Sequence, residues 1–308
     1  MDTLSSTFLF EIASGIRSIE EDIKLYEATN FNSRTDAIDF IDFHIIDRIE
    51  GLPKTGTAKE LEELKAHALQ IKNELEAIDT SLFIQLRDKI RTGIYTNGSF
   101  LEMIHEYLGS AIGNIDVTYK IGYDNLDVFM DALLSDQLIP EPILERGGEM
   151  VFYQKTPARI IFRMIKMAKL TEGDVFYDIG SGLGQVSILA HLMCGATAKG
   201  IEYEPAYCNY AKTCALQLNL SNVTFINGDA LDADYADGTV FFLYSPFKGS
   251  MLQDMLEILK TESLKRRIRI FTYGPCSLYV AKQGWLNCMN RKVNNHYELY
   301  EFRSFYNK

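Results

Sequence analysis

Apolar residues recur at three-and-four spacing through the first 140 residues, which is the period of amphipathic helices. The run from Leu61 to Ile78 is a clear case, with Leu, Ala and Ile on one face and charged residues opposite. Ser99-x-x-Glu102 fits a capping box at the start of another helix. Because residues 139–148 hold two prolines and two glycines, which mark a linker, we predict an all-helical N-terminal domain over residues 1–145.

From residue 146 the pattern changes to short apolar runs separated by longer polar or helical segments, which is typical of an α/β sheet. Only five residues separate the last two runs, so we expect an antiparallel hairpin at the edge of a sheet that is otherwise parallel. The predicted strands are 175–179, 197–202, 223–227, 239–244, 267–273, 285–290 and 296–303. Residues 146–308 are therefore predicted to form a second domain, of α/β class with seven strands.

The first predicted strand leads into a glycine-rich loop. Asp178 ends the strand, and glycines follow at 180, 182 and 184. Glycine lets a backbone turn sharply and approach a ligand, and the first amides of the next helix are unpaired donors. This string alone also fits a tight strand-to-helix turn that binds nothing. Glu202, 24 positions after Asp178, ends the second strand where a βαβ unit places a carboxylate for ribose hydroxyls, and the pair indicates a nucleotide cofactor.

Two details favour S-adenosylmethionine over a dinucleotide. Asp178 would repel a pyrophosphate and attract a cationic methionine amine. The spacing is Gly-x-Gly-x-Gly, with Gln185 following, and the third glycine of the dinucleotide pattern Gly-x-Gly-x-x-Gly is missing.

Residues 153–303 resemble the class I S-adenosylmethionine-dependent methyltransferases, which have a Rossmann-like seven-stranded sheet. Residues 178–184 match the first motif of that class. The resemblance implies that Glu202 holds the ribose, Asp229 receives the adenine amine and Tyr203 lies against the adenine face. The cofactor-binding residues that it implies are Tyr153, Thr156, Asp178, Gly180, Gly182, Gly184, Gln185, Glu202, Tyr203, Asp229 and Ala230.

The segments 153–165 and 178–186 also resemble the non-SET histone lysine methyltransferases known as disruptor of telomeric silencing. That family has an Asn-rich loop after the fourth strand. Here Tyr244, Ser245, Pro246 and Phe247 stand in that place, so a histone substrate is not carried over. Pro246 and Phe247 fit the Asn/Asp-Pro-Pro-Tyr/Phe loop of enzymes that methylate nitrogen, whereas Tyr244 and Ser245 do not. We expect these four residues to face the methyl acceptor.

Composition limits the alternatives further. The chain of 308 residues is 47% hydrophobic and 24% charged, without a run of 18 apolar residues or a basic leader, so we expect a cytoplasmic protein without a membrane span. Residues 1–150 hold 28 acidic and 13 basic side chains, and residues 151–308 hold 14 and 18. The acidic first half disfavours nucleic-acid binding without excluding it. Five cysteines without a Cys-x-x-Cys pair predict reduced thiols and no metal site.

The sequence therefore predicts an S-adenosylmethionine-dependent methyltransferase with a protein side chain as the favoured acceptor. Small molecules and RNA stay open as acceptors, and so does a module that binds the cofactor or scaffolds a partner without catalysis. The helical domain is expected to recruit or cover the substrate. The oligomeric state is left open.

Overall fold

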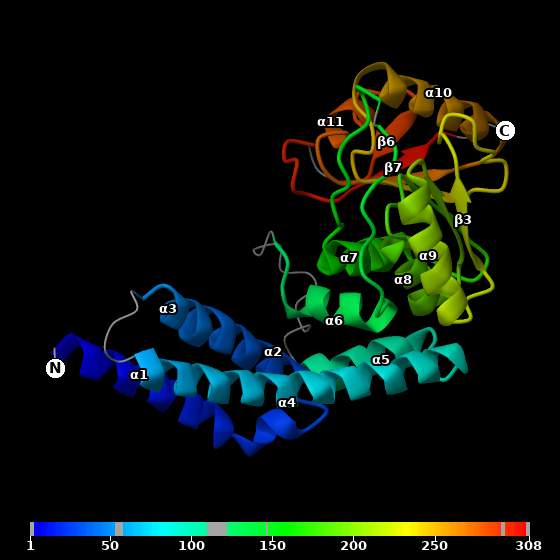
Figure 1. Ribbon diagram of the computed structural model, residues 1–308. Coiled ribbons are helices and arrows are strands. Elements are labelled where there is room, and N and C mark those ends of the chain that lie inside the picture. The colour runs from blue at the N-terminus through cyan, green and yellow to red at the C-terminus, as the bar shows by residue number, and fades with distance from the viewer. Residues whose placement is uncertain (1–2, 53–57, 110–121, 146, 291–292, 306–308) are drawn as a thin grey trace. The chain divides into compact units, whose positions relative to one another are not determined.

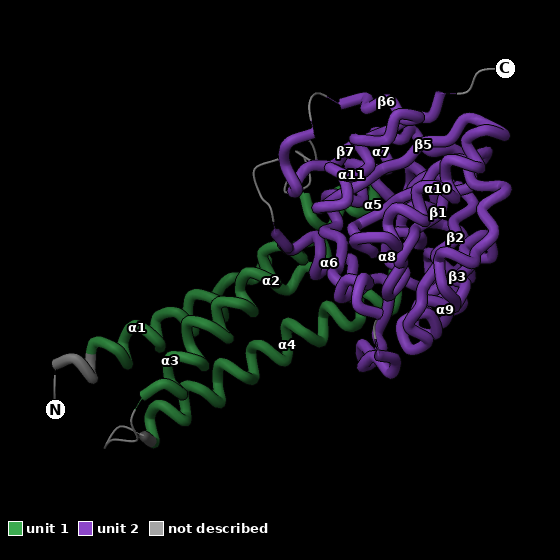
Figure 2. The backbone as a smooth tube through the Cα atoms, turned by 90° about the horizontal axis from the view of Figure 1, so that it is seen from above, with its two compact units in different colours: residues 1–86, 102–114 green, residues 87–101, 115–308 purple. Residues whose placement is uncertain are grey.

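The computed structural model describes residues 3–52, 58–109, 122–145, 147–290 and 293–305 (Figure 1). The chain divides into two compact units, one of residues 1–86 and 102–114 and one of residues 87–101 and 115–308 (Figure 2). Among the described residues, no helix is both long and apolar enough to cross a membrane.

The first unit is helical and has its own core. Isoleucines and leucines from several helices meet there, among them Ile12, Ile45 and Leu75. Arg34 is fully buried, and its Nε atom donates to Asp79 Oδ1 at 2.7 Å. The helices that contribute to this unit are α1 (Thr3–Glu20), η1 (Ile23–Tyr26), α2 (Phe31–Phe40), the π-helical η2 (Ile41–Ile46), α3 (Asp47–Glu50), α4 (Ala58–Arg91) and the end of α5 (Gly98–Leu108).

The second unit contains a seven-stranded sheet in the order β3-β2-β1-β4-β5-β7-β6. Neighbours from β3 to β5 pair in parallel, and β7 pairs antiparallel with both β5 and β6. The strands are β1 (Val175–Ile179), β2 (Thr197–Glu202), β3 (Val223–Asn227), β4 (Val240–Leu243), β5 (Arg269–Thr272), β6 (Leu286–Cys288) and β7 (Tyr300–Ser304). The predicted α/β fold with a terminal antiparallel hairpin is confirmed.

Helices cover both faces of this sheet (Figure 1). α8 and α9 contact the strands β1, β2 and β3, and α7 packs on α8. On the other face, α10 places Leu252 and Met255 in one apolar cluster with Ile179 of β1. The strand order runs in opposite directions from β1, so right-handed crossovers put the two groups of helices on opposite faces. The helices are α6 (Asn125–Leu134), α7 (Ala158–Ala168), α8 (Gln185–Cys194), α9 (Pro205–Gln217), α10 (Gly249–Lys265) and α11 (Ser277–Val280).

The last strand begins later than the expected residue 296. The N–H groups of Asn294 and Asn295 donate to the Tyr300 hydroxyl, and the side chain of Asn295 accepts from the N–H of Tyr297. These bonds belong to a turn, and the ladder with β5 begins at Tyr300, which pairs with Thr272.

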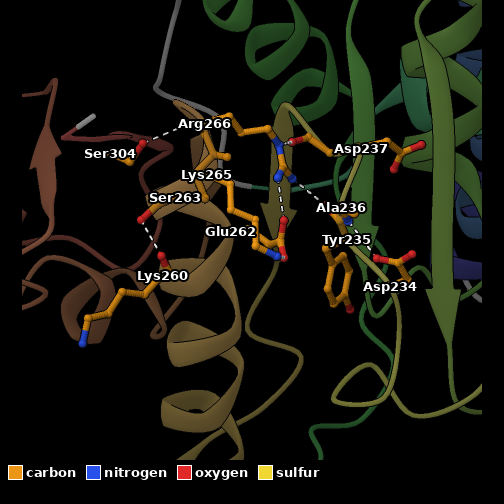
Figure 3. A network of polar contacts seen from close by, with 12 residues as sticks. Asp234, Tyr235, Ala236, Asp237, Lys260, Glu262, Ser263, Lys265, Arg266 and Ser304 are labelled. Atoms are coloured by element: carbon orange, nitrogen blue, oxygen red, sulfur yellow. Dashed lines mark hydrogen bonds and ion pairs between the residues drawn. The ribbon is translucent and has the colours of Figure 1, made fainter. Parts of the chain in front are cut away.

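A polar network fixes the loop before β4 to the end of α10 (Figure 3). The Arg266 guanidinium donates to the carbonyls of Tyr235 and Gly238 and to the Glu262 carboxylate. Asp237 accepts from the Tyr177 hydroxyl at 2.7 Å. This network lies near the amino ends of the strands, so it fixes the frame of the sheet and leaves the carboxyl ends free for a site.

Candidate cofactor site

A cavity opens at the carboxyl ends of β1, β2 and β4. This is where the strand order reverses, the usual position of a ligand site in an open α/β sheet. Its lining residues lie in the five segments 142–156, 178–186, 201–207, 228–230 and 244–247. Nearly all of the predicted site residues meet there; Gly182 and Gly184 are the two that do not line the cavity.

These two glycines instead allow close packing around the loop. Gly182 has a φ of +51°, and a Cβ there would lie 2.2 Å from the ring of Tyr153. Gly184 has a φ of +83°, and a Cβ there would lie 2.5 Å from the ring of Phe225 and 2.7 Å from Ala211. Gly180 lines the cavity itself. It has a φ of +79°, and a Cβ there would lie 2.7 Å from Pro246, so all three glycines seat the loop against its neighbours, and Gly180 also borders the cavity.

Asp178 is a buried carboxylate at the end of β1. Its side chain is 3% exposed, and Oδ2 makes no hydrogen bond to any described residue. Burial, together with the nearby Glu202 carboxylate, raises its pKa well above the usual range. A buried carboxylate without a partner is costly, and a cationic ligand group would supply one.

Ser181 and Gln185 add more unpaired polar atoms to the same cavity. The Ser181 hydroxyl and both polar atoms of the Gln185 amide are buried without a partner in the described structure. The predicted site residues do not include Ser181, although its position between two glycines of the motif is a signal that points to the site. Buried polar groups are rarely left unpaired, so the cluster indicates a ligand with both donors and acceptors.

Glu202 faces the glycine loop from the end of β2. One carboxylate oxygen accepts from the N–H of Gly182 at 2.6 Å, and the other accepts from the N–H of Glu204 at 2.8 Å. Burial raises the pKa of Glu202 in spite of these bonds, which act to lower it. Each oxygen keeps a lone pair that could accept from a ribose hydroxyl.

The loops after β2 and β3 are tied together beside Glu202. The Asn227 amide donates to the carbonyls of Glu202 and Tyr203 at 2.9 and 3.0 Å. Asp229 Oδ1 accepts from the N–H of Leu231, and Tyr203, Asp229 and Ala230 all line the cavity. Asn227 therefore sets the spacing between the predicted ribose and adenine residues.

Tyr153 and Thr156 lie on the segment before α7 and line the cavity. The Tyr153 ring covers Gly182 and lies 5.3 Å from the ring of Tyr207, centroid to centroid. The segment is held from α6, because the buried Asp127 carboxylate accepts from the N–H of Ala158 at 2.8 Å. α6 thereby helps to place Tyr153 over the glycine loop.

The loop at 244–247 lines the cavity, and its side chains point in different directions. Ser245 has a φ of +44°, and its hydroxyl accepts from the N–H of Cys276 at 3.0 Å, so it is turned into the protein. Phe247 is 7% exposed and belongs to the core. Tyr244 is half-buried and packs on Tyr273. Of the four residues, Tyr244 and Pro246 are partly exposed, whereas Ser245 and Phe247 are buried.

The same loop is paired to the segment that carries Tyr153. Met150 and Phe247 form an antiparallel bridge, and the N–H of Val151 donates to the carbonyl of Pro246 at 3.1 Å. The cover of the glycine loop and the expected acceptor loop are therefore one connected structure.

The charges of the cavity decide between cofactors. Its described lining residues include the carboxylates of Asp178, Glu202, Glu204 and Asp229 and no lysine or arginine. Such a lining disfavours a pyrophosphate and suits S-adenosylmethionine, which carries an ammonium and a sulfonium. The residues present thus fit that cofactor. In the described parts of the chain, no group of three or more His, Cys, Asp or Glu could hold a metal ion.

The sheet order, with acids at the ends of β1 and β2 around a glycine loop, defines a class I S-adenosylmethionine-dependent methyltransferase. Residues 146–233 match the family model described as histone methylation protein DOT1. The resemblance predicted for the cofactor half is confirmed over this segment. The match ends before the loop at 244–247 and leaves that loop unassigned.

The protein is also similar to solved methyltransferase structures. An RNA methyltransferase from Salinibacter ruber, in complex with S-adenosyl-L-homocysteine, is 27% identical, with 49% of this chain and 92% of that chain covered and a TM-score of 0.40. A precorrin-6y C5,15-methyltransferase from Geobacter metallireducens GS-15 is 20% identical over 51% and 94% of the two chains, with a TM-score of 0.37. An S-adenosylmethionine-dependent methyltransferase from Aquifex aeolicus is 18% identical over 47% and 88%, also with a TM-score of 0.37.

Proposed function

We propose that this protein transfers the methyl group of S-adenosylmethionine to a protein side chain. The observation that carries the cofactor part is a set of buried polar atoms on Asp178, Ser181 and Gln185, which have no partner among the described residues and line one cavity with Glu202. A site of this kind is costly when its polar atoms lack partners, and a polar, cationic ligand would supply them.

The chain offers a partner for each part of the cofactor. Asp178 would hold the methionine ammonium, and Thr156 and Gln185 its carboxylate. Glu202 would accept from the ribose hydroxyls. Asp229 would accept from the adenine amine, and Tyr203 would lie on the adenine face. When bound, the cofactor supplies a methyl group on a positively charged sulfur, which a nucleophile displaces in line.

The residues at the acceptor side would act by positioning. Residues 244–247 contribute no carboxylate or imidazole, and burial raises the pKa of the Tyr244 phenol, so it stays protonated. Tyr244 can then donate a hydrogen bond but is a poor base at neutral pH. An amine acceptor would have to enter in its neutral form, with its proton lost to solvent before transfer.

A protein acceptor is supported by the match of residues 146–233 to a family model described as a histone methylation protein. The acidic first half of the chain, with 28 acidic and 13 basic residues among residues 1–150, also suits a basic protein better than a nucleic acid. A cytoplasmic location stays a prediction from the sequence.

Labelled methyl transfer tests the proposal. Purified protein is incubated with S-adenosylmethionine carrying a labelled methyl group and with fractionated cell extract, and the label is sorted among protein, RNA and small molecules. We expect label in protein, and its loss with Glu202→Gln. Label in RNA or small molecules alone would overturn the acceptor class. Binding of S-adenosylhomocysteine without any transfer would favour a non-catalytic module.

A further inference from the structure

The segment 142–144 forms part of the cavity wall although it belongs to no helix or strand. Pro142 and Leu144 line the cavity, and 40% of Leu144 is exposed. A surface segment outside helices and strands can be fixed in place by hydrogen bonds between its backbone and the rest of the protein.

Glu204 provides that bond. Its side chain is 7% exposed, and Oε2 accepts from the N–H of Leu144 at 2.9 Å, 60 residues away in the chain. Oε1 accepts from the N–H of Ala206 at 3.0 Å, so the same carboxylate also caps α9. Burial acts to raise the pKa of Glu204, but the N–H groups of Leu144, Ala206 and Ile143 outweigh it and hold the pKa below its usual range. The carboxylate is therefore ionised and firmly bonded.

The bond also connects the segment to the predicted ribose acid. The N–H of Glu204 donates to Glu202 Oε1 at 2.8 Å. Tyr203 lies between the two acids, and Tyr207 follows on the first turn of α9; both line the cavity. The segment 142–144 is thus attached just beyond the end of β2, beside the predicted adenosine residues.

We propose that residues 142–144 form the outer wall of the adenosine subsite, and that Glu204 is the positioning residue that holds this wall. The inference rests on the proposed cofactor and deepens it. Pro142 and Leu144 offer an apolar surface to the adenosyl group, and Glu204 acts on the cofactor through Leu144.

The test compares two ligands in three variants by calorimetry. S-adenosylhomocysteine has both the adenosine and the amino-acid part, whereas methylthioadenosine lacks the amino acid. Glu204→Ser keeps a capping oxygen for α9 and is too short to reach Leu144. We expect it to weaken the binding of both ligands by roughly tenfold or more. Asp178→Asn should weaken S-adenosylhomocysteine alone, and the exposed Glu145→Ser should change neither.

The outcomes separate the two proposals. If wild type binds S-adenosylhomocysteine and Glu204→Ser binds it equally well, the wall is overturned and the cofactor assignment stands. If the wild-type protein binds neither ligand, the cofactor assignment is wrong, and the proposed role of residues 142–144 is then wrong as well. Should Glu204→Ser fail to fold, Leu144→Ala decides, because it keeps the backbone N–H and removes the wall side chain. Unchanged binding of both ligands by Leu144→Ala would overturn the inference. In a transfer assay, we expect Glu204→Ser and Leu144→Ala to raise the KM for S-adenosylmethionine and to leave kcat unchanged.

Discussion

Asp178 lowers the stability of the free protein, and the same carboxylate is available to bind a cationic ligand. Its buried carboxylate has an oxygen without a hydrogen bond to any described residue and lies near a second acid, the partly buried Glu202. Such a group destabilises the fold unless a ligand pairs with it. Functional sites often keep groups of this kind, at a cost in stability that is offset when the ligand binds.

Replacing this carboxylate should separate stability from binding. Asp178→Asn keeps the shape and removes the charge, so we expect the free protein to gain about 1–3 kcal/mol. The pKa of Asp178 is raised in the folded state, so the native carboxylate costs stability as pH rises, and the gain from Asn should grow with pH. Thermal unfolding at several pH values measures the gain, and calorimetry measures the loss of S-adenosylhomocysteine affinity. A variant that is less stable at every pH would contradict this account.

Cofactor binding should also release protons. In the free protein, burial and Glu202 raise the pKa of Asp178, whereas a bound ammonium would favour the ionised carboxylate. Affinity should therefore increase as pH rises from the ordinary aspartate range near 4 up to the raised pKa, and then level off. Calorimetry in two buffers of different ionisation enthalpy measures the proton release, which Asp178→Asn should reduce. Proton uptake on binding would refute the assignment.

At the scale of elements, the glycine loop depends on its neighbours on both sides. A side chain at position 184 would overlap Phe225 and Ala211 and would need a positive φ. We expect Gly184→Ala to destabilise the protein by about 2–4 kcal/mol, from overpacking and from the left-handed backbone. Urea denaturation measures the loss. Gly284→Ala is the control, since a Cβ there meets nothing within 4 Å and its φ lies outside the positive region. Equal stabilities for the two variants would show that the loop can shift freely.

The sheet could be predicted closely, because each strand is a local apolar run. The first three strands have the expected bounds, and the hairpin followed from a short connection.

The capping box predicted at Ser99 is wrong: the helix already begins at Gly98, and the Ser99 hydroxyl donates to the carbonyl of Thr96. The structure has a capping box at Asp124 and Asp127 instead, with aspartate in both roles.

Within the site, the acids and glycines could be predicted because a motif fixes their spacing. The inward orientation of the Ser245 side chain could not be predicted, because it depends on the backbone N–H of Cys276, 31 residues later in the chain. The bond between Glu204 and Leu144 could not be predicted either, because its donor is also a distant backbone N–H. Any residue except proline can supply a backbone donor, so such contacts leave no mark in the sequence.

At the scale of the molecule, the compact unit that holds the sheet includes residues 87–101 and 115–145. Three contacts illustrate this membership. The N–H of Asn97 donates to the carbonyl of Leu192 at 2.7 Å, Arg87 donates to the carbonyl of Ala132, and Asp127 accepts from Ala158. Proline and glycine mark where a chain can turn, but they do not tell which core a helix joins. The domain boundary at 145 stays a prediction.

This membership predicts the behaviour of a shortened chain. A fragment of residues 141–308 keeps every lining residue of the cavity but loses α6, whose Phe129, Met130 and Leu133 are fully buried. Truncating one buried side chain of this size costs about 2–5 kcal/mol, and the N–H of Ala158 would also lose its acceptor. We therefore expect the fragment to lack a cooperative thermal transition and to bind S-adenosylhomocysteine poorly. Full-length Asp127→Asn is the matched control: it keeps α6 and an acceptor for Ala158, so it should unfold cooperatively and bind. A fragment with the melting temperature and affinity of the whole chain would instead place the structural boundary near residue 145.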